Sequence, residues 1–243
     1  MSSTATHAES PIVPEPMQSN WTTAATRPVS RQNLNDLFNN RIPDVRFRRF
    51  LTPYQCQKLV EIIQSHQIGS YDEHVFPPIG SIGTTQFGNK HDKAAYFSQV
   101  AEARSLQERF RKEANVDVIG LVKELLQHST GLPVRIAQEG DQEYFAGLVR
   151  LIDRSALLHA DYGVYDGPDW EISKITAQIT WNILLKQVEG GESIVYDRPW
   201  EGPSDDAKFK NTPSYGYKPE VIQNRMSKSM KYEEGDLHFF NSS

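Results

Sequence analysis

Residues 174–185 read KITAQITWNILL and constrain the fold more than any other part of the chain. Apolar residues such as Ile179 and Trp181 alternate there with polar residues such as Gln178 and Asn182. Because neighbouring side chains of a strand point to opposite sides of its sheet, this alternation predicts a strand with two different faces.

Several other short segments in the second half of the chain are rich in β-branched and aromatic residues and are separated by turns. They cover residues 148–152, 155–159, 191–196 and 236–241. Such segments are typical of strands. Residues 46–130 instead carry helical patterns, and helices followed by many strands favour an α+β chain. We expect residues 134–243 to form a sandwich or barrel.

The clearest helix start lies at Thr52, which is followed by Pro53 and by apolar residues at helical spacing. Thr is a favoured N-cap, and Pro is favoured in the first turn of a helix. The face predicted to be buried carries Cys56, Leu59, Ile62 and Ile63. We interpret the cysteine as a packed core thiol and not as a nucleophile. A second helical region is expected at residues 98–129, ended by Gly131.

Residues 1–30 are rich in Ser, Thr, Ala and Pro, with few large hydrophobic residues before Trp21. Such a segment buries too little apolar surface to offset the entropy lost on ordering. It is therefore predicted to be a disordered leader, and the folded domain is expected to cover residues 31–243.

The 243-residue chain has a formal net charge of -5. This acidic balance argues against a nucleic-acid partner, because binding to a phosphate backbone needs clustered Lys and Arg. The basic run at residues 46–49 is interpreted as a solvated face. The sequence shows one cysteine, no long apolar stretch and no secretory signal pattern. We therefore expect a cytoplasmic protein with no membrane partner.

The triplet His159–Ala160–Asp161 follows directly after the apolar residues 155–158. On an extended strand the first and third residues of a triplet point to the same side, so an imidazole and a carboxylate can converge on one metal ion. A second histidine from another strand would complete the two-His, one-carboxylate site of non-heme iron(II) enzymes. The alternative is a His–Asp pair at a strand end that only contributes stability.

A run of short motifs accompanies this triplet in a fixed order. They are FLTPYQCQKLV at 50–60, GLPV at 131–134, VRLI at 149–152, LLHAD at 157–161, EGGESIVYD at 189–197 and GDLHFFN at 235–241. Together with the strand at 174–185, they resemble the iron(II)- and 2-oxoglutarate-dependent oxygenases. The resemblance is closest to the free-standing halogenases and hydroxylases that modify alkaloid-type natural products.

The resemblance implies that residues 31–243 are an oxygenase-like domain, with N-terminal helices packed on a double-stranded β-helix (jelly-roll, cupin-like) core. It also implies that His159 and Asp161 are catalytic and bind Fe(II), with 2-oxoglutarate as cosubstrate and a small molecule of secondary metabolism as substrate. Halogenases of this group carry Gly where this chain has Asp161, and the missing carboxylate makes room for chloride. The expected reaction is therefore hydroxylation, or another oxidation of a C–H bond.

By the same resemblance, a second metal histidine follows the strand at residues 236–241, and a basic residue for 2-oxoglutarate follows later. Both are expected beyond Ser243. His238 lies within the strand and is interpreted as a strand side chain and not as a ligand. The jelly roll is thus expected to be incomplete at its C-terminal end. An incomplete gene product, a degenerate homologue and a partner subunit that supplies the missing strands all stay open.

Two further sets of residues are candidates for the site. The candidates to bind 2-oxoglutarate are the strand residues Arg150, Gln178 and Asn182, each of which could equally face solvent. The candidates for the substrate pocket are the loop aromatics Tyr162, Tyr165 and Trp170, for which simple packing is the alternative. The polar stretch at residues 201–234 is interpreted as a lid or a long insertion.

Two other functions compete with the small-molecule oxygenase. One is a non-catalytic, truncated homologue that acts as a ligand-binding or partner subunit. The other is an oxygenase that acts on nucleic acid or protein, and the acidic balance argues against its nucleic-acid version.

Overall fold

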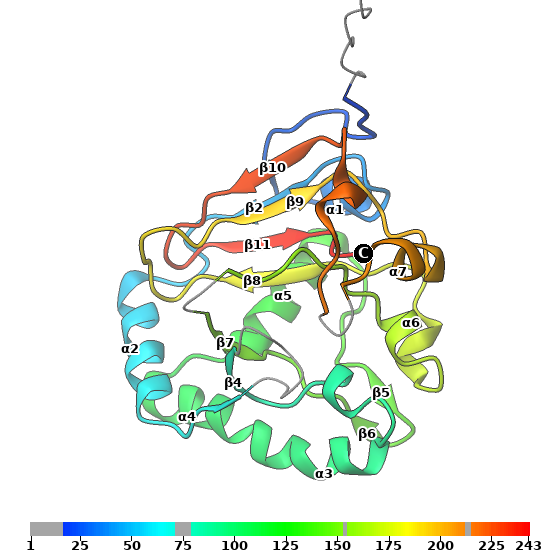
Figure 1. Cartoon of the computed structure of the whole chain (residues 1–243). Helices are drawn as coiled ribbons and strands as arrows, with labels where there is room; N and C mark the ends of the chain where they lie inside the picture. The colour runs from blue at the N-terminus through cyan, green and yellow to red at the C-terminus, as the bar shows by residue number, and fades with distance from the viewer. Residues whose placement is uncertain (1–16, 71–78, 153–154, 212–214) are drawn as a thin grey trace, which may run out of the picture.

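The computed structural model describes residues 17–70, 79–152, 155–211 and 215–243, and Figure 1 shows the arrangement of its helices and strands. The helices are α1 (Arg31–Phe38), α2 (Pro53–Gln64), α3 (Lys93–Ala103), α4 (Ser105–Ala114), α5 (Val118–Thr130), α6 (Gly163–Asp166) and α7 (Pro203–Phe209). Short 3₁₀ turns cover Phe87–Asn89, Glu171–Lys174 and Pro219–Ile222.

The strands are short and mostly antiparallel. They are β1 (Arg27–Pro28), β2 (Asp44–Phe47), β3 (Gly69–Ser70), β4 (Gly80–Ile82), β5 (Gln138–Glu139), β6 (Gln142–Glu143), β7 (Val149–Leu151), β8 (Thr180–Ile183), β9 (Ser193–Tyr196), β10 (Ser227–Met230) and β11 (Leu237–Phe240). A four-stranded sheet has the order β1-β2-β11-β8, and a three-stranded sheet has the order β3-β4-β7. The pairs β9–β10 and β5–β6 form two further small sheets.

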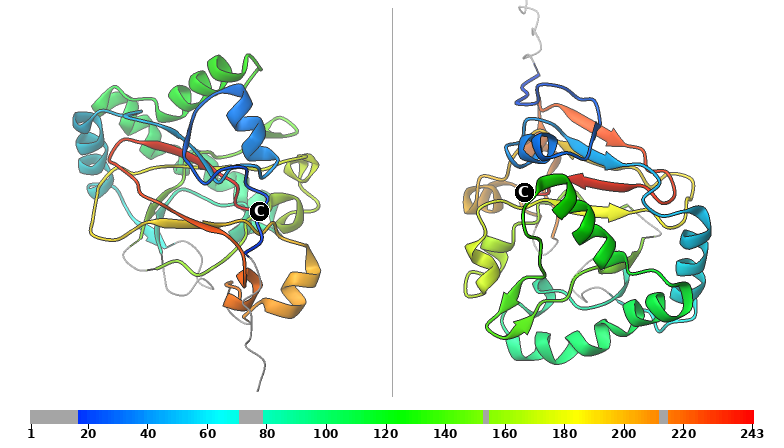
Figure 2. Two further views of the ribbon diagram at one scale, coloured as in Figure 1. Left: turned by 90° about the horizontal axis from the view of Figure 1, so that it is seen from above. Right: turned by 180° about the vertical axis from the view of Figure 1, so that it is seen from behind.

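The four-stranded sheet has the two different faces that its sequence predicts. Leu237 and Phe239 of β11 are buried on one face, in a cluster with residues of α1 and α5, and Trp181 of β8 packs against the same cluster. Figure 2 shows α5 lying across this face. On the opposite side lies the β9–β10 pair (Figure 2), and Lys228 of β10 forms an ion pair of 2.7 Å with the buried Asp44 of β2.

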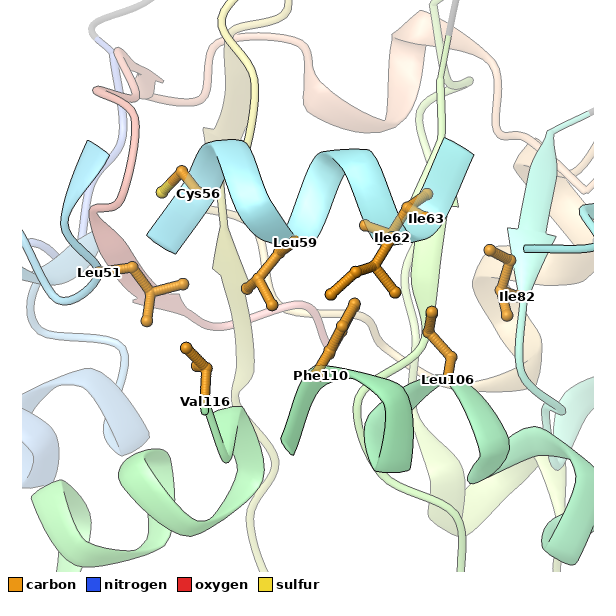
Figure 3. Packing of buried hydrophobic residues seen from close by; sticks show 9 residues of the cluster. All are labelled: Leu51, Cys56, Leu59, Ile62, Ile63, Ile82, Leu106, Phe110 and Val116. Carbon is orange, nitrogen blue, oxygen red and sulfur yellow. The ribbon is translucent and has the colours of Figure 1, made fainter. Parts of the chain in front are cut away.

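Helix α2 begins as predicted. The Thr52 side chain accepts a hydrogen bond from the Gln55 backbone N–H, and the Gln55 side chain bonds back to the Thr52 N–H, which completes a capping box. Figure 3 shows Leu59 and Ile62 of the predicted face pointing toward Phe110 of α4, and Cys56, near the start of the helix, belongs to the same buried cluster. Cys56 is therefore a packed core thiol as expected, and burial raises the pKa of its thiol.

Several predicted elements differ from the structure. The strand predicted at 174–185 is formed only over Thr180–Ile183. The helical region predicted at 98–129 consists of three helices, α3 to α5, the first of which begins at Lys93. Asn115 adopts a left-handed conformation and ends α4. Residues 155–159 do not form a strand, because the Leu157 N–H and the Leu158 carbonyl bond to Tyr215 and Tyr217 instead of to a sheet neighbour.

Part of the predicted leader, residues 17–30, lies within the described part of the chain. Trp21 is buried, and its backbone N–H lies 3.1 Å from the Asp197 carboxylate. The Ser19 hydroxyl donates to the same carboxylate at 2.7 Å. Trp21 supplies enough apolar surface, and Asp197 enough hydrogen-bonding capacity, to hold this segment. The first 16 residues lie outside the described part of the chain.

The fold is therefore mixed helix and sheet, which confirms the α+β prediction at this level. The jelly-roll core stays a prediction, because the described strands form several small sheets. In the part of the chain that the structure covers, no helix is long and apolar enough to cross a membrane.

Candidate metal centre

His159 and Asp161 lie side by side in the segment that leads into α6. His159 Nε2 is 3.8 Å from Asp161 Oδ2, and both side chains are partly accessible to solvent. The other ring nitrogen, Nδ1, is 2.6 Å from the carbonyl oxygen of Leu157. Since a carbonyl oxygen can only accept, Nδ1 must carry the proton and donate.

This tautomer fits the role of a metal ligand. With its proton on Nδ1, the neutral imidazole presents a free lone pair on Nε2, beside the carboxylate of Asp161. Two ligands about 2.1 Å from one ion and at right angles would lie about 3 Å apart, so a small closure of the observed 3.8 Å suffices. Within the described ranges, no group of three or more His, Cys, Asp or Glu side chains is placed to hold a metal ion.

The backbone of Asp161 is held from two sides. Its N–H donates to the carbonyl of Ser242 at 2.8 Å. Its carbonyl accepts from Gln178 Nε2 at 2.8 Å, while Gln178 Oε1 accepts from the Gly163 N–H, also at 2.8 Å. Gln178 therefore joins the strand region before β8 to both ends of the turn that carries Asp161, and Figure 1 shows the C-terminal end of the chain close to α6 and α7.

A second carboxyl group lies close to the pair. Asp166 ends α6, and burial raises the pKa of its carboxyl group, with a further contribution from the negative charge of Asp161. The region is thus acidic, which suits the binding of a cation.

The two predicted pocket tyrosines meet a tryptophan that the sequence did not single out. The ring centre of Tyr165 is 4.6 Å from that of Trp200, and the ring centre of Tyr162 is 6.2 Å from it. Tyr165 is 43% exposed, so part of this aromatic cluster is open to solvent.

Trp170 is the third pocket candidate, and its surroundings favour the alternative of simple packing. Trp170 is only 2% exposed and packs against Tyr96, Phe97 and Tyr144. Its indole N–H donates to the Lys90 carbonyl at 3.0 Å. A tryptophan that is buried with its donor satisfied is a core residue, and packing explains it fully.

The three residues predicted to bind 2-oxoglutarate lie in different parts of the fold. Gln178 contacts the Asp161 turn. Asn182 lies further along β8, where it pairs with His238 of β11, and its side chain is exposed. Arg150 is on β7, opposite Ser81 in the three-stranded sheet. The structure thus brings one of the three to the candidate pair.

His238 is a buried strand side chain, as predicted. Its Nδ1 lies 3.6 Å from Asp44 Oδ2, and its ring packs against Tyr232 with 4.4 Å between ring centres. Burial alone would raise the pKa of Asp44, but its interactions with the nearby His238 ring and the Lys228 ammonium outweigh burial and leave the pKa lowered.

Sequence reasoning missed Trp200, which contacts Tyr162 and Tyr165, and Tyr215, which contacts His159. The Tyr215 ring meets that of His159 edge-on, with 5.6 Å between ring centres. Both residues belong to the region after β9, most of which was interpreted as a lid or insertion. Two aromatic residues near a polar, Pro-containing stretch were the available signal.

A His–X–Asp pair whose imidazole and carboxylate could both reach one metal ion, beside a mixed helix-and-sheet body, makes the chain a candidate non-heme metalloprotein. Comparison with known proteins identifies the family within this class. The model of the family "Carrier-protein-independent halogenase WelO5" matches residues 22–243, and the chain belongs to this family of iron(II)- and 2-oxoglutarate-type enzymes. The chain is also similar to the "Leucinostatins biosynthesis cluster protein S" of Purpureocillium lilacinum. The two are 54% identical over 190 residues, which cover 77% of this chain and 76% of that protein.

Proposed function

We propose that this protein is an Fe(II)- and 2-oxoglutarate-dependent oxygenase that oxidises a C–H bond of a small molecule in secondary metabolism. The observation that carries the proposal is the His159–Asp161 pair, in which Nε2 lies 3.8 Å from the carboxylate while Nδ1 lies 2.6 Å from the Leu157 carbonyl oxygen. The family and the biosynthetic-cluster relative support the reaction class and its setting.

His159 Nε2 and the Asp161 carboxylate would hold the iron, which together with 2-oxoglutarate supplies the power to oxidise an unactivated C–H bond. The Leu157 carbonyl keeps the proton of His159 on Nδ1. Gln178 and Ser242 hold the Asp161 backbone, so that its carboxylate stays beside the imidazole.

A third metal ligand is part of the proposal, and Ser242 indicates where it would enter. The chain that leaves β11 reaches the Asp161 backbone at this residue. A ligand that follows β11, or one from a partner subunit that pairs with the sheet edge at β8, would approach the site from this side. The sheet and the opposing β9–β10 pair would then be the two layers of a jelly-roll core.

We assign hydroxylation, or a related oxidation, and not halogenation. The carboxylate of Asp161 would fill the metal position that a halide needs. Tyr162, Tyr165 and Trp200 would contact the substrate. Of the residues predicted to bind 2-oxoglutarate, Gln178 lies at the Asp161 turn, while Asn182 and Arg150 stay predictions.

The proposal is tested by the conversion of 2-oxoglutarate to succinate in air, with iron(II) and the whole chain. The wild type should form succinate above the protein-free background, and His159→Ala should not. His91→Ala, which changes an exposed histidine outside the site, is the matched control and should behave like the wild type.

Chloride tests the choice between hydroxylation and halogenation. The anaerobic iron(II)–2-oxoglutarate spectrum of the wild type should be insensitive to chloride, whereas that of Asp161→Gly should shift as chloride enters. A chloride-dependent shift in the wild type would contradict the assignment of Asp161 as a ligand.

The alternative is a non-catalytic subunit that binds a ligand or a companion protein. The observation that favours it is the two-residue donor set within the described part of the chain. Folded wild-type protein that forms no succinate alone, but forms it when a companion subunit is added, would support this alternative.

A further inference from the structure

We infer that Tyr215 is a positioning residue for His159, and that it acts through the peptide that sets the imidazole tautomer. The inference rests on the proposed function, because it concerns the same metal site. It adds a residue from a distant loop to the two ligands.

Tyr215 contacts the ligand segment in two ways. Its hydroxyl oxygen accepts a hydrogen bond from the Leu157 N–H at 2.8 Å. Its ring lies edge-on to the His159 ring, with an interplanar angle of 73° and 5.6 Å between ring centres. One side chain thus contacts both the backbone before the ligand and the ligand itself.

The hydrogen bond from the Leu157 N–H to the Tyr215 hydroxyl matters because the carbonyl of the same residue accepts the hydrogen bond of His159. Its N–H is held by Tyr215, and its carbonyl accepts the proton of His159 Nδ1 at 2.6 Å. Holding the N–H limits the movement of this residue, so the carbonyl stays in place as the acceptor. The lone pair then stays on Nε2, where a metal would bind. The ring contact limits rotation of the imidazole away from Asp161.

The residues that follow Tyr215 also contact the segment that leads into His159. The Tyr217 N–H donates to the Leu158 carbonyl at 2.7 Å. Between them, Gly216 passes so close to Leu157 that an added Cβ would lie 2.8 Å from the Leu157 Cβ. Only glycine allows this approach, which brings Tyr215 and Tyr217 onto successive residues of the ligand segment.

Helix α7 fixes the segment from the other side. The Tyr217 hydroxyl donates to the Asp206 carboxylate, and the Lys218 N–H donates to the Phe209 carbonyl at 2.8 Å. The start of α7 is held by a buried ion pair, in which Arg198 Nη2 lies 2.7 Å from Asp205 Oδ1. A buried, two-pronged Arg–Asp pair is rigid, so Tyr215 is presented from a fixed support.

Two substitutions separate the contacts of Tyr215. Tyr215→Phe removes the hydroxyl acceptor and keeps the ring, whereas Tyr215→Leu removes both. Tyr54→Leu is the matched control, because Tyr54 is 67% exposed on α2. The whole chain is used throughout.

The first readout is the His159 tautomer in the metal-free protein, measured from the imidazole ¹⁵N shifts and assigned by their loss in His159→Ala. The second readout is the affinity for Co(II) under anaerobic conditions. Tyr215→Leu should mix the two tautomers and weaken Co(II) binding by about tenfold or more, as the loss of such an outer support does in other metal sites. Tyr215→Phe should fall between it and the wild type.

A purely structural role would lower Tm and leave the tautomer and the Co(II) affinity of the folded protein unchanged. That result in both Tyr215 variants would overturn the inference. Should Tyr215→Leu fail to fold, the near-isosteric Tyr215→Phe decides alone, and wild-type values in both readouts would overturn it. Should the wild type itself not bind Co(II), the proposed function fails, while the tautomer comparison still decides the role of Tyr215.

Discussion

The backbone N–H of Asp161 donates to the carbonyl oxygen of Ser242, with 2.8 Å between nitrogen and oxygen. The Ser242 hydroxyl also accepts a hydrogen bond from the Thr180 hydroxyl at 2.8 Å. Residues from three distant parts of the chain therefore meet at the candidate ligand. This meeting point makes the geometry of Asp161 depend on contacts far from it in sequence.

Gln178 supplies the most direct test of this dependence. Gln178→Ala would leave the Asp161 carbonyl and the Gly163 N–H without their shared partner, so the turn should loosen. We predict that affinity for Co(II) falls by about tenfold, measured by anaerobic titration. Gln57→Ala, at an exposed site on α2, is the control and should bind like the wild type. Equal affinity in the two variants would contradict the role of Gln178.

Gly235 precedes β11 in a left-handed conformation with φ of 81°, and an added Cβ would overlap the Leu51 carbonyl oxygen. Gly190 has the same φ of 81° but has open space around its Cα. Both Ala variants should lose about 1–2 kcal/mol to backbone strain. Gly235→Ala should lose about 1–3 kcal/mol more to the overlap, measured by urea unfolding. Similar losses in the two variants would show that the chain at Leu51 gives way freely.

Asp197 joins the N-terminal segment to the end of β9. Burial alone would raise the pKa of its carboxyl group, but hydrogen bonds from Ser19 and Asn20 outweigh burial and leave the pKa lowered. Asp197→Asn presents an amide N–H₂ to groups that are themselves donors, so the segment should detach. We predict a loss of about 1–3 kcal/mol and faster hydrogen exchange around Trp21. Asp141→Asn, in an exposed turn, should change neither, and unchanged exchange in Asp197→Asn would contradict the prediction.

Asp44 makes the stability of the fold depend on pH. Because its pKa is lowered in the folded state, its contribution is fully present above the ordinary carboxyl pKa of 3.8 and is lost as pH falls through the folded value. Asp44→Asn breaks the buried pair with Lys228 and should cost about 3 kcal/mol at pH 7. This difference from the wild type should shrink in urea unfolding below pH 4. A difference that is constant with pH would contradict the account.

The parts of the fold that were predicted well depend on local chemistry. The N-cap at Thr52 and the helix end at Gly131 after α5 follow from neighbours within a few residues. The alternation around Trp181 likewise identified the face of β8 that packs on the core. Each of these signals is complete within one short segment.

The site was predicted only in part, because its remaining members are defined by long-range packing. Trp170 and Trp200 both lie in loops, and the sequence gives no sign that the first packs on Tyr96 while the second meets Tyr165. The contact of Tyr215 with His159 is equally hidden in the sequence, since His159 is 56 residues earlier in the chain (215 − 159 = 56). The His–X–Asp spacing could be read locally, but the supports around it could not.

The central claim is that His159 and Asp161 bind iron(II) together with 2-oxoglutarate. The most direct measurement is an anaerobic titration of the 243-residue protein with both, followed by the visible charge-transfer band of the chelated complex. We predict a saturable band in the wild type and in His91→Ala, and no band in His159→Ala or Asp161→Ala. Folded wild-type protein without a band, or a band that survives both substitutions, would contradict the claim.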